Sequence, residues 1–234
     1  ILKKANHKIG LYTSPHLIDF KERIRINFKA IKSKDIKQFL SNYKKEISKI
    51  KPSFFEIMTV MALWYFHKNK IKIAVLEAGL GGRLDSTTAC LNQYIVFTSI
   101  SMDHKEILGD TIEKITQEKA AAITNNNQYC IANKNNKIID SIIKSRADQL
   151  NVPVNFIQLG NQNFKLNYLH GEHQKENAFL AINLVKLLNK HKLVKVSLDN
   201  IYSYLTSTKW PGRFQTIASS PNIIFDVCHN AESI

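Results

Sequence analysis

The feature that most constrains the fold of this chain is an alternation of two kinds of segment along its 234 residues. Short runs rich in β-branched and aromatic residues, such as 72–78 and 94–100, are followed by longer segments with apolar residues at helical spacing, such as 112–124. This order is typical of βαβ units, in which helices cover the faces of a parallel sheet. The sequence therefore predicts an α/β fold with a mostly parallel sheet flanked by helices.

The same periodicities predict the individual elements and a domain boundary. Helices are expected at 34–50, 54–68, 112–124, 137–150, 173–189 and 198–206, and strands at 23–27, 72–78, 94–100, 128–132, 154–158, 164–169, 213–218 and 222–226. Ser53 and Glu56 have the spacing of a capping box, and Pro52 prevents an earlier helix start. Helical periodicity stops near Lys209, so we expect one domain over 1–208, with 209–234 as a linker and the first strands of a second α/β domain.

Composition excludes several classes of protein. No apolar run approaches the roughly 20 residues that cross a bilayer, and the first residues lack the apolar core of a secretory signal. Cys90, Cys130 and Cys228 are too scattered for a disulfide framework or a thiolate metal site. We therefore expect a cytoplasmic globular protein with no membrane association.

The formal net charge of +14 comes mainly from lysine and has two interpretations. It can reflect a solvated surface with a biased composition, or it can attract an anionic substrate. The charge is dispersed and no nucleic-acid-binding module is recognised, so a nucleic-acid-binding protein is the least favoured class.

A glycine-rich segment, Gly79-Leu-Gly-Gly-Arg-Leu-Asp85, follows the expected strand that ends at Glu77. In open α/β sheets, ligands bind at the carboxyl ends of the strands. Leu84 replaces the third glycine of a dinucleotide motif, and no Gly-Lys-Ser/Thr follows, so neither a dinucleotide loop nor a Walker A loop fits. The simple alternative is a tight turn with Glu77 paired to a lysine.

Other polar residues follow expected strands or turns. Asp103 and His104 suit metal coordination or proton transfer, although such a pair is also typical of a structural cap. Hydroxyls near Ser14, before a proline, can face a hard cation or belong to an ordinary turn. Toward the end of the chain, Arg213 could stabilise phosphoryl charge, and Asp226 lies where a polar group can reach a ligand.

Together these segments resemble the folylpolyglutamate synthase and dihydrofolate synthase family of the Mur ligase superfamily. The motifs that carry the resemblance are Ser14-Pro-His-Leu17, Phe54-Phe-Glu56, Glu77-x-Gly-Leu-Gly-Gly-Arg-Leu-Asp85, Asp103-His104, Glu118-Lys-Ala120, His173-Gln-x-x-Asn177, Trp210-Pro-Gly-Arg213 and Asp226-x-x-His229-Asn230. They occur in the family's order and cover nearly the whole chain. One departure is Val227-Cys228, where the family usually has Gly-Ala.

The resemblance implies the fold of a P-loop-type Mur ligase central domain and two magnesium sites. Ser14, Glu77 and His104 match magnesium ligands, and Lys119 matches a lysine that the family converts to a carbamate. A carbamate would replace a repelling ammonium with an anionic oxygen ligand. His229 matches a catalytic position near the transferring phosphate.

The resemblance also implies the substrates. Asn177, Arg213 and Asp226 match ATP contacts. The residues that match the lining of the pterin-bearing substrate site are Ser53, Phe54, Phe55, Glu56, Leu84, Asp85 and Ser86. A monomeric ligase is implied that phosphorylates the carboxylate of a folate or pteroate with ATP and transfers the acyl group to L-glutamate.

The family's Gly-Lys-Ser phosphate loop is expected upstream of Ile1, and its C-terminal domain after Ile234. We therefore expect this polypeptide alone to show no ligase turnover. Two alternatives remain open. One is a Mur-type peptidoglycan amino-acid ligase, and the other is a non-catalytic remnant that binds folate or a partner protein.

Overall fold

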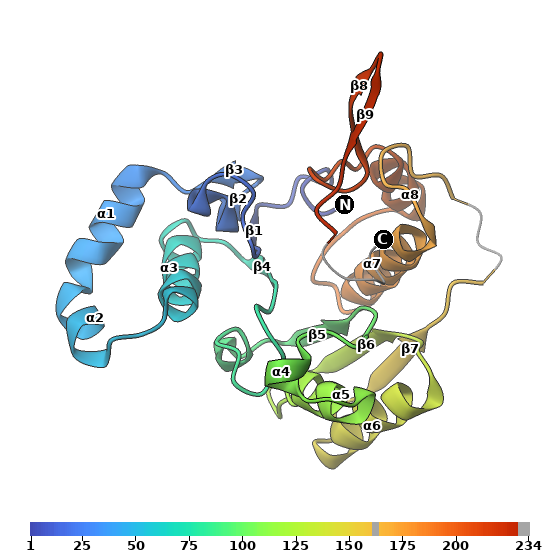
Figure 1. Ribbon diagram of the computed structural model, residues 1–234, viewed down its shortest axis with the longest axis horizontal. Coiled ribbons are helices and arrows are strands. Elements are labelled where there is room, and N and C mark those ends of the chain that lie inside the picture. The colour runs from blue at the N-terminus through green and yellow to red at the C-terminus, as the bar shows by residue number, and fades with distance from the viewer. Residues whose placement is uncertain (161–163, 229–234) are drawn as a thin grey trace. The chain divides into compact units, whose positions relative to one another are not determined.

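The computed structural model describes residues 1–160 and 164–228, and the chain divides into two compact units (Figure 1). The N-terminal unit comprises Asn6–Asn92 together with Leu2. The C-terminal unit comprises the chain from Gln93 onward, together with Ile1 and Lys3–Ala5. Each unit has a sheet of its own, and the expected domain boundary near Lys209 stays a prediction.

The N-terminal unit is built on a mixed sheet of four strands. The strands are β1 (Ile9–Tyr12), β2 (Ile24–Ile26), β3 (Lys29–Ala30) and β4 (Ile73–Leu76), in the order β3-β2-β1-β4. β1 and β4 are parallel, and Tyr12 pairs with Leu76 at their carboxyl ends. The residues that follow these two strands therefore emerge at the same edge of the sheet.

Three α-helices complete this unit: α1 (Ser33–Asn42), α2 (Lys44–Ile50) and α3 (Phe54–Lys68). α3 packs on the sheet, and its Met58 and Met61 share a buried core with Tyr12 of β1. The predicted capping box starts α3. The Ser53 amide donates to Glu56 Oε2 at 2.7 Å, and the Glu56 amide donates to Ser53 Oγ at 3.3 Å. Two short 3-10 helices are η1 (Phe20–Arg23) and η2 (Thr88–Cys90).

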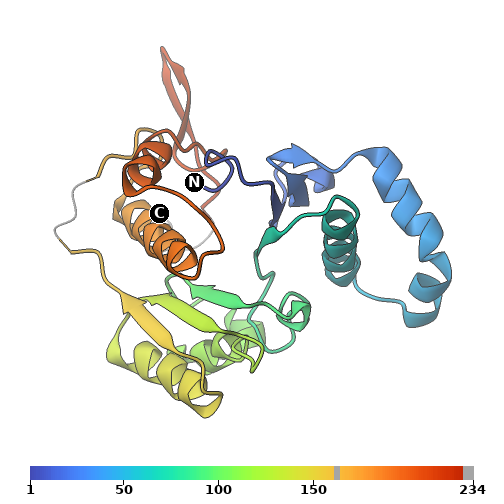
Figure 2. The same ribbon diagram turned by 180° about the vertical axis from the view of Figure 1, so that it is seen from behind.

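The C-terminal unit contains a parallel sheet between two helical layers (Figures 1 and 2). Its strands are β5 (Tyr94–Phe97), β6 (Tyr129–Asn133) and β7 (Val154–Ile157). On one face lie α4 (Lys105–Leu108), α5 (Ile112–Ala120) and α6 (Lys137–Gln149), and on the other lies α7 (Glu172–Lys190). Ile131, Ile157 and Leu180 form a buried cluster between the sheet and α7.

The last elements of this unit are α8 (Leu198–Thr206) and an antiparallel hairpin of β8 (Gln215–Ser219) and β9 (Asn222–Phe225). Within the described part of the chain, no helix has both the length and the apolar character needed to cross a membrane. The expected α/β class, with parallel strands flanked by helices, is confirmed.

Two predictions about elements are wrong. The expected strand at 164–169 is absent, because this segment pairs with the end of α8 instead of a sheet, through the Asn167 amide and the Thr206 carbonyl. The expected helix 34–50 divides at Tyr43, whose φ of −113° and ψ of 16° depart from helical values. The Tyr43 ring packs 4.9 Å from the ring of Phe39, so local packing accompanies this break.

Candidate functional site

Ser14 and Glu77, two predicted magnesium ligands, are adjacent in the N-terminal unit. The Glu77 amide donates to the Tyr12 carbonyl at 2.9 Å, which continues the pairing of β1 with β4. The Ser14 amide donates to Glu77 Oε2 at 2.9 Å. Hydroxyl and carboxylate oxygens are the ligands that magnesium prefers, so this half of the predicted ligand set fits the ion.

The glycine-rich segment is folded around the carboxylate of Asp85, which is only 8% exposed. Asp85 Oδ2 accepts hydrogen bonds from the amides of Gly79 and Leu80 at 2.7 and 3.0 Å. Its Oδ1 accepts from the amide and the hydroxyl of Thr87 at 2.9 and 2.6 Å. A carboxylate that accepts four hydrogen bonds organises the loop. Contact between Asp85 and a substrate stays a prediction.

Helix α3 is tied to the glycine-rich segment through hydroxyl groups and one aromatic ring. The Thr59 hydroxyl lies 2.7 Å from Ser86 Oγ, 3.2 Å from the Tyr12 hydroxyl and 3.0 Å from the Phe55 carbonyl oxygen. The Phe55 ring approaches Gly79 so closely that a Cβ there would lie 2.6 Å from it. These contacts bring the two predicted substrate segments, 53–56 and 84–86, next to each other.

A hollow of about 420 Å³ opens beside this junction, and all of its lining belongs to the N-terminal unit. Apolar side chains supply most of the wall: Phe39, Tyr43, Ile47, Ile57, Val60 and Leu63. Glu56, Thr59, Ser86 and Cys90 add polar groups. Ligand sites in proteins are commonly of this kind, mostly apolar with a few convergent polar groups.

The C-terminal unit holds the other two predicted metal ligands. His104 follows β5 in a left-handed conformation, with φ of 51°. Its amide donates to Asp103 Oδ1 at 2.8 Å. Burial lowers the pKa of the Lys119 amine, an effect that the charge of Asp103 opposes. His104, Asp103 and Lys119 thus belong to one region of this unit.

The predicted ATP contacts also lie in the C-terminal unit. Asp226 Oδ1 accepts a hydrogen bond from the Cys228 amide at 2.8 Å, and its Oδ2 accepts one from the Phe214 amide. Although burial works in the opposite direction, these backbone donors and the charge of Arg213 lower the pKa of Asp226. Asn177 lies in the N-terminal half of α7. His229 is outside the described residues.

The segment that precedes α7 neighbours the Trp-Pro-Gly-Arg motif. The rings of His170 and Phe214 lie 5.6 Å apart in an edge-on arrangement. The Val227 amide donates to the Gly212 carbonyl at 3.0 Å, and a Cβ at Gly212 would lie 2.8 Å from Val227 Cγ1. Val227, which departs from the family's usual glycine, therefore packs directly on the motif.

The four predicted magnesium ligands divide between the two units, two in each, and their convergence on one ion stays a prediction. Among residues 1–160 and 164–228, no group of three or more His, Cys, Asp or Glu side chains could hold a metal ion.

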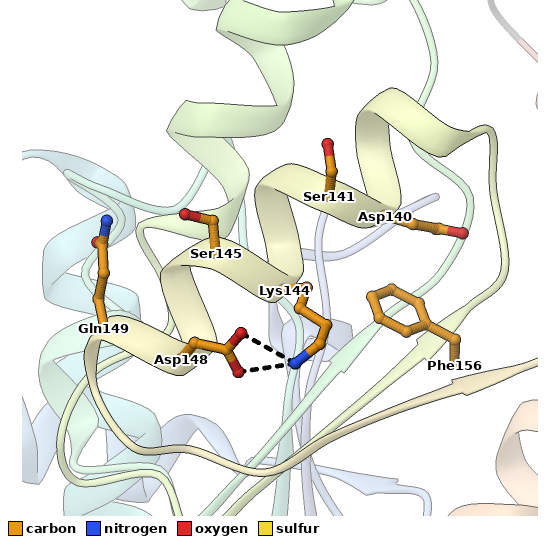
Figure 3. Close-up of a pocket in the computed structure, with 7 residues that line it drawn as sticks. All are labelled: Asp140, Ser141, Lys144, Ser145, Asp148, Gln149 and Phe156. Carbon is orange, nitrogen blue, oxygen red and sulfur yellow. Dashed lines mark hydrogen bonds and ion pairs between the residues drawn. The ribbon is translucent and has the colours of Figure 1, made fainter.

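A second hollow, of about 580 Å³, lies along α6 and β7 (Figure 3). Asp140, Lys144, Asp148 and Phe156 contribute to its lining, and the Lys144 amine donates to both carboxylate oxygens of Asp148. None of the predicted site residues lines it.

Sequence reasoning missed Tyr12, Thr59 and Cys90. Tyr12 ends β1, a strand that was not among the predicted elements. Thr59 looks like one more apolar-face position of α3, and only its contacts indicate a role. Burial and the charge of Asp85 raise the pKa of the Cys90 thiol, which is therefore protonated at neutral pH.

Comparison with known proteins identifies the family of this chain. The family model of the Mur ligase middle domain matches residues 29–215. The chain belongs to the Mur ligase family. This finding confirms the superfamily that the motifs indicated.

Named relatives point to the folate branch of the Mur ligase family. The chain is 31% identical to the dihydrofolate synthase/folylpolyglutamate synthase of Bacillus subtilis, over all of this chain and 61% of that protein. It is 32% identical to the enzyme of the same name from Buchnera aphidicola, over all of this chain and 58% of that protein. The chain thus spans about three fifths of these relatives.

A solved structure agrees with these relatives. Escherichia coli FolC in complex with DHPP and ADP is 28% identical and has a TM-score of 0.87, over 99% of this chain and 58% of that one. The resemblance to folylpolyglutamate and dihydrofolate synthases is thereby confirmed.

Proposed function

We propose that this chain is the central part of an ATP-dependent ligase that joins L-glutamate to dihydropteroate or to a folate. The observation that carries the proposal is the hollow in the N-terminal unit. Glu56 and Ser86, which come from the two predicted substrate segments, both contribute to its wall. A largely apolar hollow with hydroxyl groups suits a flat heteroaromatic ring such as a pterin.

The relatives support the same substrates. The Bacillus and Buchnera proteins are named for dihydrofolate and folylpolyglutamate synthesis. The similar Escherichia coli structure is described as a complex with DHPP and ADP. Pteroyl acids and ATP are therefore the ligands that we assign to this chain.

In the proposed reaction, a carboxylate oxygen of the pteroyl acid attacks the γ-phosphorus of ATP, and ADP leaves. The amine of glutamate then attacks the acyl carbon, and phosphate leaves as the amide forms. Asn177, Arg213 and Asp226 would hold ATP, with His229 near the transferring phosphate. The chain contributes mainly alignment of the two reacting groups, which lowers the barrier by making the encounter intramolecular.

Ser14, Glu77 and His104 would hold magnesium, together with Lys119 as a carbamate. Bound magnesium would offset charge on the phosphate oxygens during transfer. The lowered pKa of Lys119 favours the neutral amine, which must attack carbon dioxide and lose a proton to form the carbamate. Nuclear magnetic resonance with ¹³C-labelled bicarbonate would detect this group. A signal that is unchanged in Lys119→Arg would contradict the assignment.

The substrate proposal is tested by titrating the purified chain with pteroate and following its intrinsic fluorescence. We expect saturable binding that Ser86→Leu weakens by filling the hollow. Ser141→Leu, at the second hollow on α6, is the matched control and should bind as the wild type does. If circular dichroism shows that Ser86→Leu is unfolded, Val60→Phe, at an exposed position of the same hollow, replaces it.

The same titration separates the alternatives. Saturable binding of a UDP-linked sugar without binding of pteroate would favour a peptidoglycan amino-acid ligase. Pteroate binding together with no detectable binding of ADP in the presence of magnesium would favour a remnant that has lost its nucleotide site. Absence of pteroate binding to the folded chain would overturn the proposal.

A further inference from the structure

Arg23 is held by one edge and one face of its guanidinium group. Its Nε donates to Nδ1 of His16 at 3.0 Å, and its central carbon lies 5.4 Å from the centroid of the Phe54 ring. Within residues 1–160 and 164–228, neither terminal nitrogen of Arg23 has a hydrogen-bond or ion-pair partner. The guanidinium is therefore oriented by its surroundings while its two outer amino groups remain available.

Arg25, two residues further along the chain, is different. Its Nε donates to the Glu22 carbonyl oxygen at 2.6 Å, and its Nη2 lies 3.8 Å from Glu22 Oε2. A carboxylate of its own segment thus offsets the charge of Arg25. No carboxylate within the described chain does this for Arg23.

Arg23 lies beside Ser14, one of the proposed magnesium ligands, and beside Phe54, one of the proposed substrate residues. Its carbonyl oxygen accepts a hydrogen bond from the Thr13 amide at 2.9 Å, which fixes the backbone of Arg23 beside the turn of Ser14. Phe54, under the guanidinium, is 54% exposed and begins α3 next to the capping box. Arg23 therefore lies among the turn of Ser14 and the start of α3, and all of these residues belong to the N-terminal unit.

A guanidinium group binds a carboxylate through two parallel hydrogen bonds, and an oriented guanidinium loses less freedom when it does so. The contact with His16 also requires that Nδ1 of His16 carries no proton, because this atom accepts the hydrogen bond. We propose that the outer amino groups of Arg23 bind the carboxylate of the acid substrate. The inference rests on the proposed function and adds a specificity-determining residue to it.

The experiment compares pteroate with its methyl ester, which has the same ring system and no carboxylate charge. Binding of both ligands to the full 234-residue chain is measured by fluorescence titration. Arg23→Gln should weaken pteroate binding about tenfold or more, as expected for a charge-assisted hydrogen-bonded pair. Binding of the methyl ester should be unchanged. Arg23→Lys keeps the positive charge but cannot form two parallel hydrogen bonds. Its affinity for pteroate should therefore lie between those of the wild type and Arg23→Gln.

Arg25→Gln is the matched control and should not change the ratio of the two affinities. If Arg23 only fastens its loop to α3, Arg23→Gln will lower the melting temperature and weaken both ligands equally, which overturns the inference and leaves the proposed function intact. If Arg23→Gln weakens the binding of free L-glutamate and leaves pteroate binding unchanged, Arg23 binds a carboxylate of the amino acid. That result would also overturn the inference. If the wild-type chain binds neither pterin ligand, the proposed function itself fails, and this inference fails with it.

Discussion

Each unit has a loop that is organised by one aspartate, but the two aspartates differ in burial. Asp85 in the N-terminal unit is buried and accepts four hydrogen bonds from its loop. Asp226 in the C-terminal unit is exposed and accepts two, from the amides of Phe214 and Cys228. Hydrogen bonds to a buried charge contribute more to stability than those that water can replace. The glycine-rich loop therefore depends strongly on Asp85 for its conformation, whereas the loop of Asp226 depends less on its aspartate.

The largest expected effect comes from removing each aspartate in turn. Asp85→Ala should destabilise the N-terminal unit by about 3 kcal/mol, because it leaves several loop donors without an acceptor. Asp226→Ala should cost about 1 kcal/mol or less, because water can reach the freed amides. Denaturant unfolding of both variants, with hydrogen exchange to locate the loss, measures the difference. Equal losses would show that burial does not separate the two loops.

The second effect concerns a glycine in each unit. Gly79→Ala places a methyl group 2.6 Å from the Phe55 ring, so this ring, which packs against Tyr12, must shift. We expect a loss of about 2 kcal/mol from this overpacking. Gly212→Ala meets the end of the Val227 side chain at 2.8 Å and also carries strain at φ of 72°.

Val227 follows the β8–β9 hairpin, whose residues are mostly exposed, so this region can yield more easily than α3. We therefore expect Gly212→Ala to cost about 1 kcal/mol, mainly from the positive φ. Thermal melts of the two alanine variants test the order. A greater loss for Gly212→Ala than for Gly79→Ala would mean that backbone strain outweighs packing here.

A smaller difference is expected between helix caps. Ser53 and Glu56 cap α3 reciprocally, whereas Thr111 caps α5 with a single bond to the Lys114 amide at 3.3 Å. Ser53→Ala should cost about 1 kcal/mol and Thr111→Ala about half as much. Unfolding free energies of the two variants give the comparison, and Ser53→Thr should recover most of the loss at α3.

The smallest effect is a dependence on pH at the start of α3. Hydrogen bonds from the side chain and amide of Ser53 lower the pKa of Glu56. Because the pKa in the folded state is depressed, the stabilisation is present at neutral pH and is lost as the pH falls through that pKa. The difference in melting temperature between wild type and Glu56→Gln should therefore shrink on acidification. A constant difference would indicate that the carboxylate charge is irrelevant to this cap.

Features that depend on neighbouring residues could be predicted from the sequence. α3 begins after Ser53 and ends at Lys68 as expected, because Pro52 and the capping box act within a few residues. α8 has the predicted bounds, and its N-cap Ser197 accepts from the Asn200 amide at 3.3 Å. The family was also recognisable, since its motifs are local strings whose order along the chain is enough.

Features that depend on distant residues were not predictable. The strand expected at 164–169 does not form, and the Asn167 amide instead donates a hydrogen bond to the carbonyl oxygen of Thr206, far along the chain. Nothing local distinguishes Thr59 from its neighbours on α3, and only folding places its hydroxyl against Ser86. The sequence shows that Arg23 carries a charge, but only its contacts with His16 and Phe54 show how its guanidinium is oriented.

The sequence alone thus determined the α/β class, the sharp start of α3 and the membership of the Mur ligase family. Each of these follows from hydrogen bonds, periodicity or residue order within a short stretch of chain. Tertiary structure decided that Ser14 meets Glu77, that Asp85 is buried within its loop, and that a hollow opens between α3 and its neighbours. These outcomes depend on packing between segments distant in sequence, where close approach and loss of water determine which polar groups find partners.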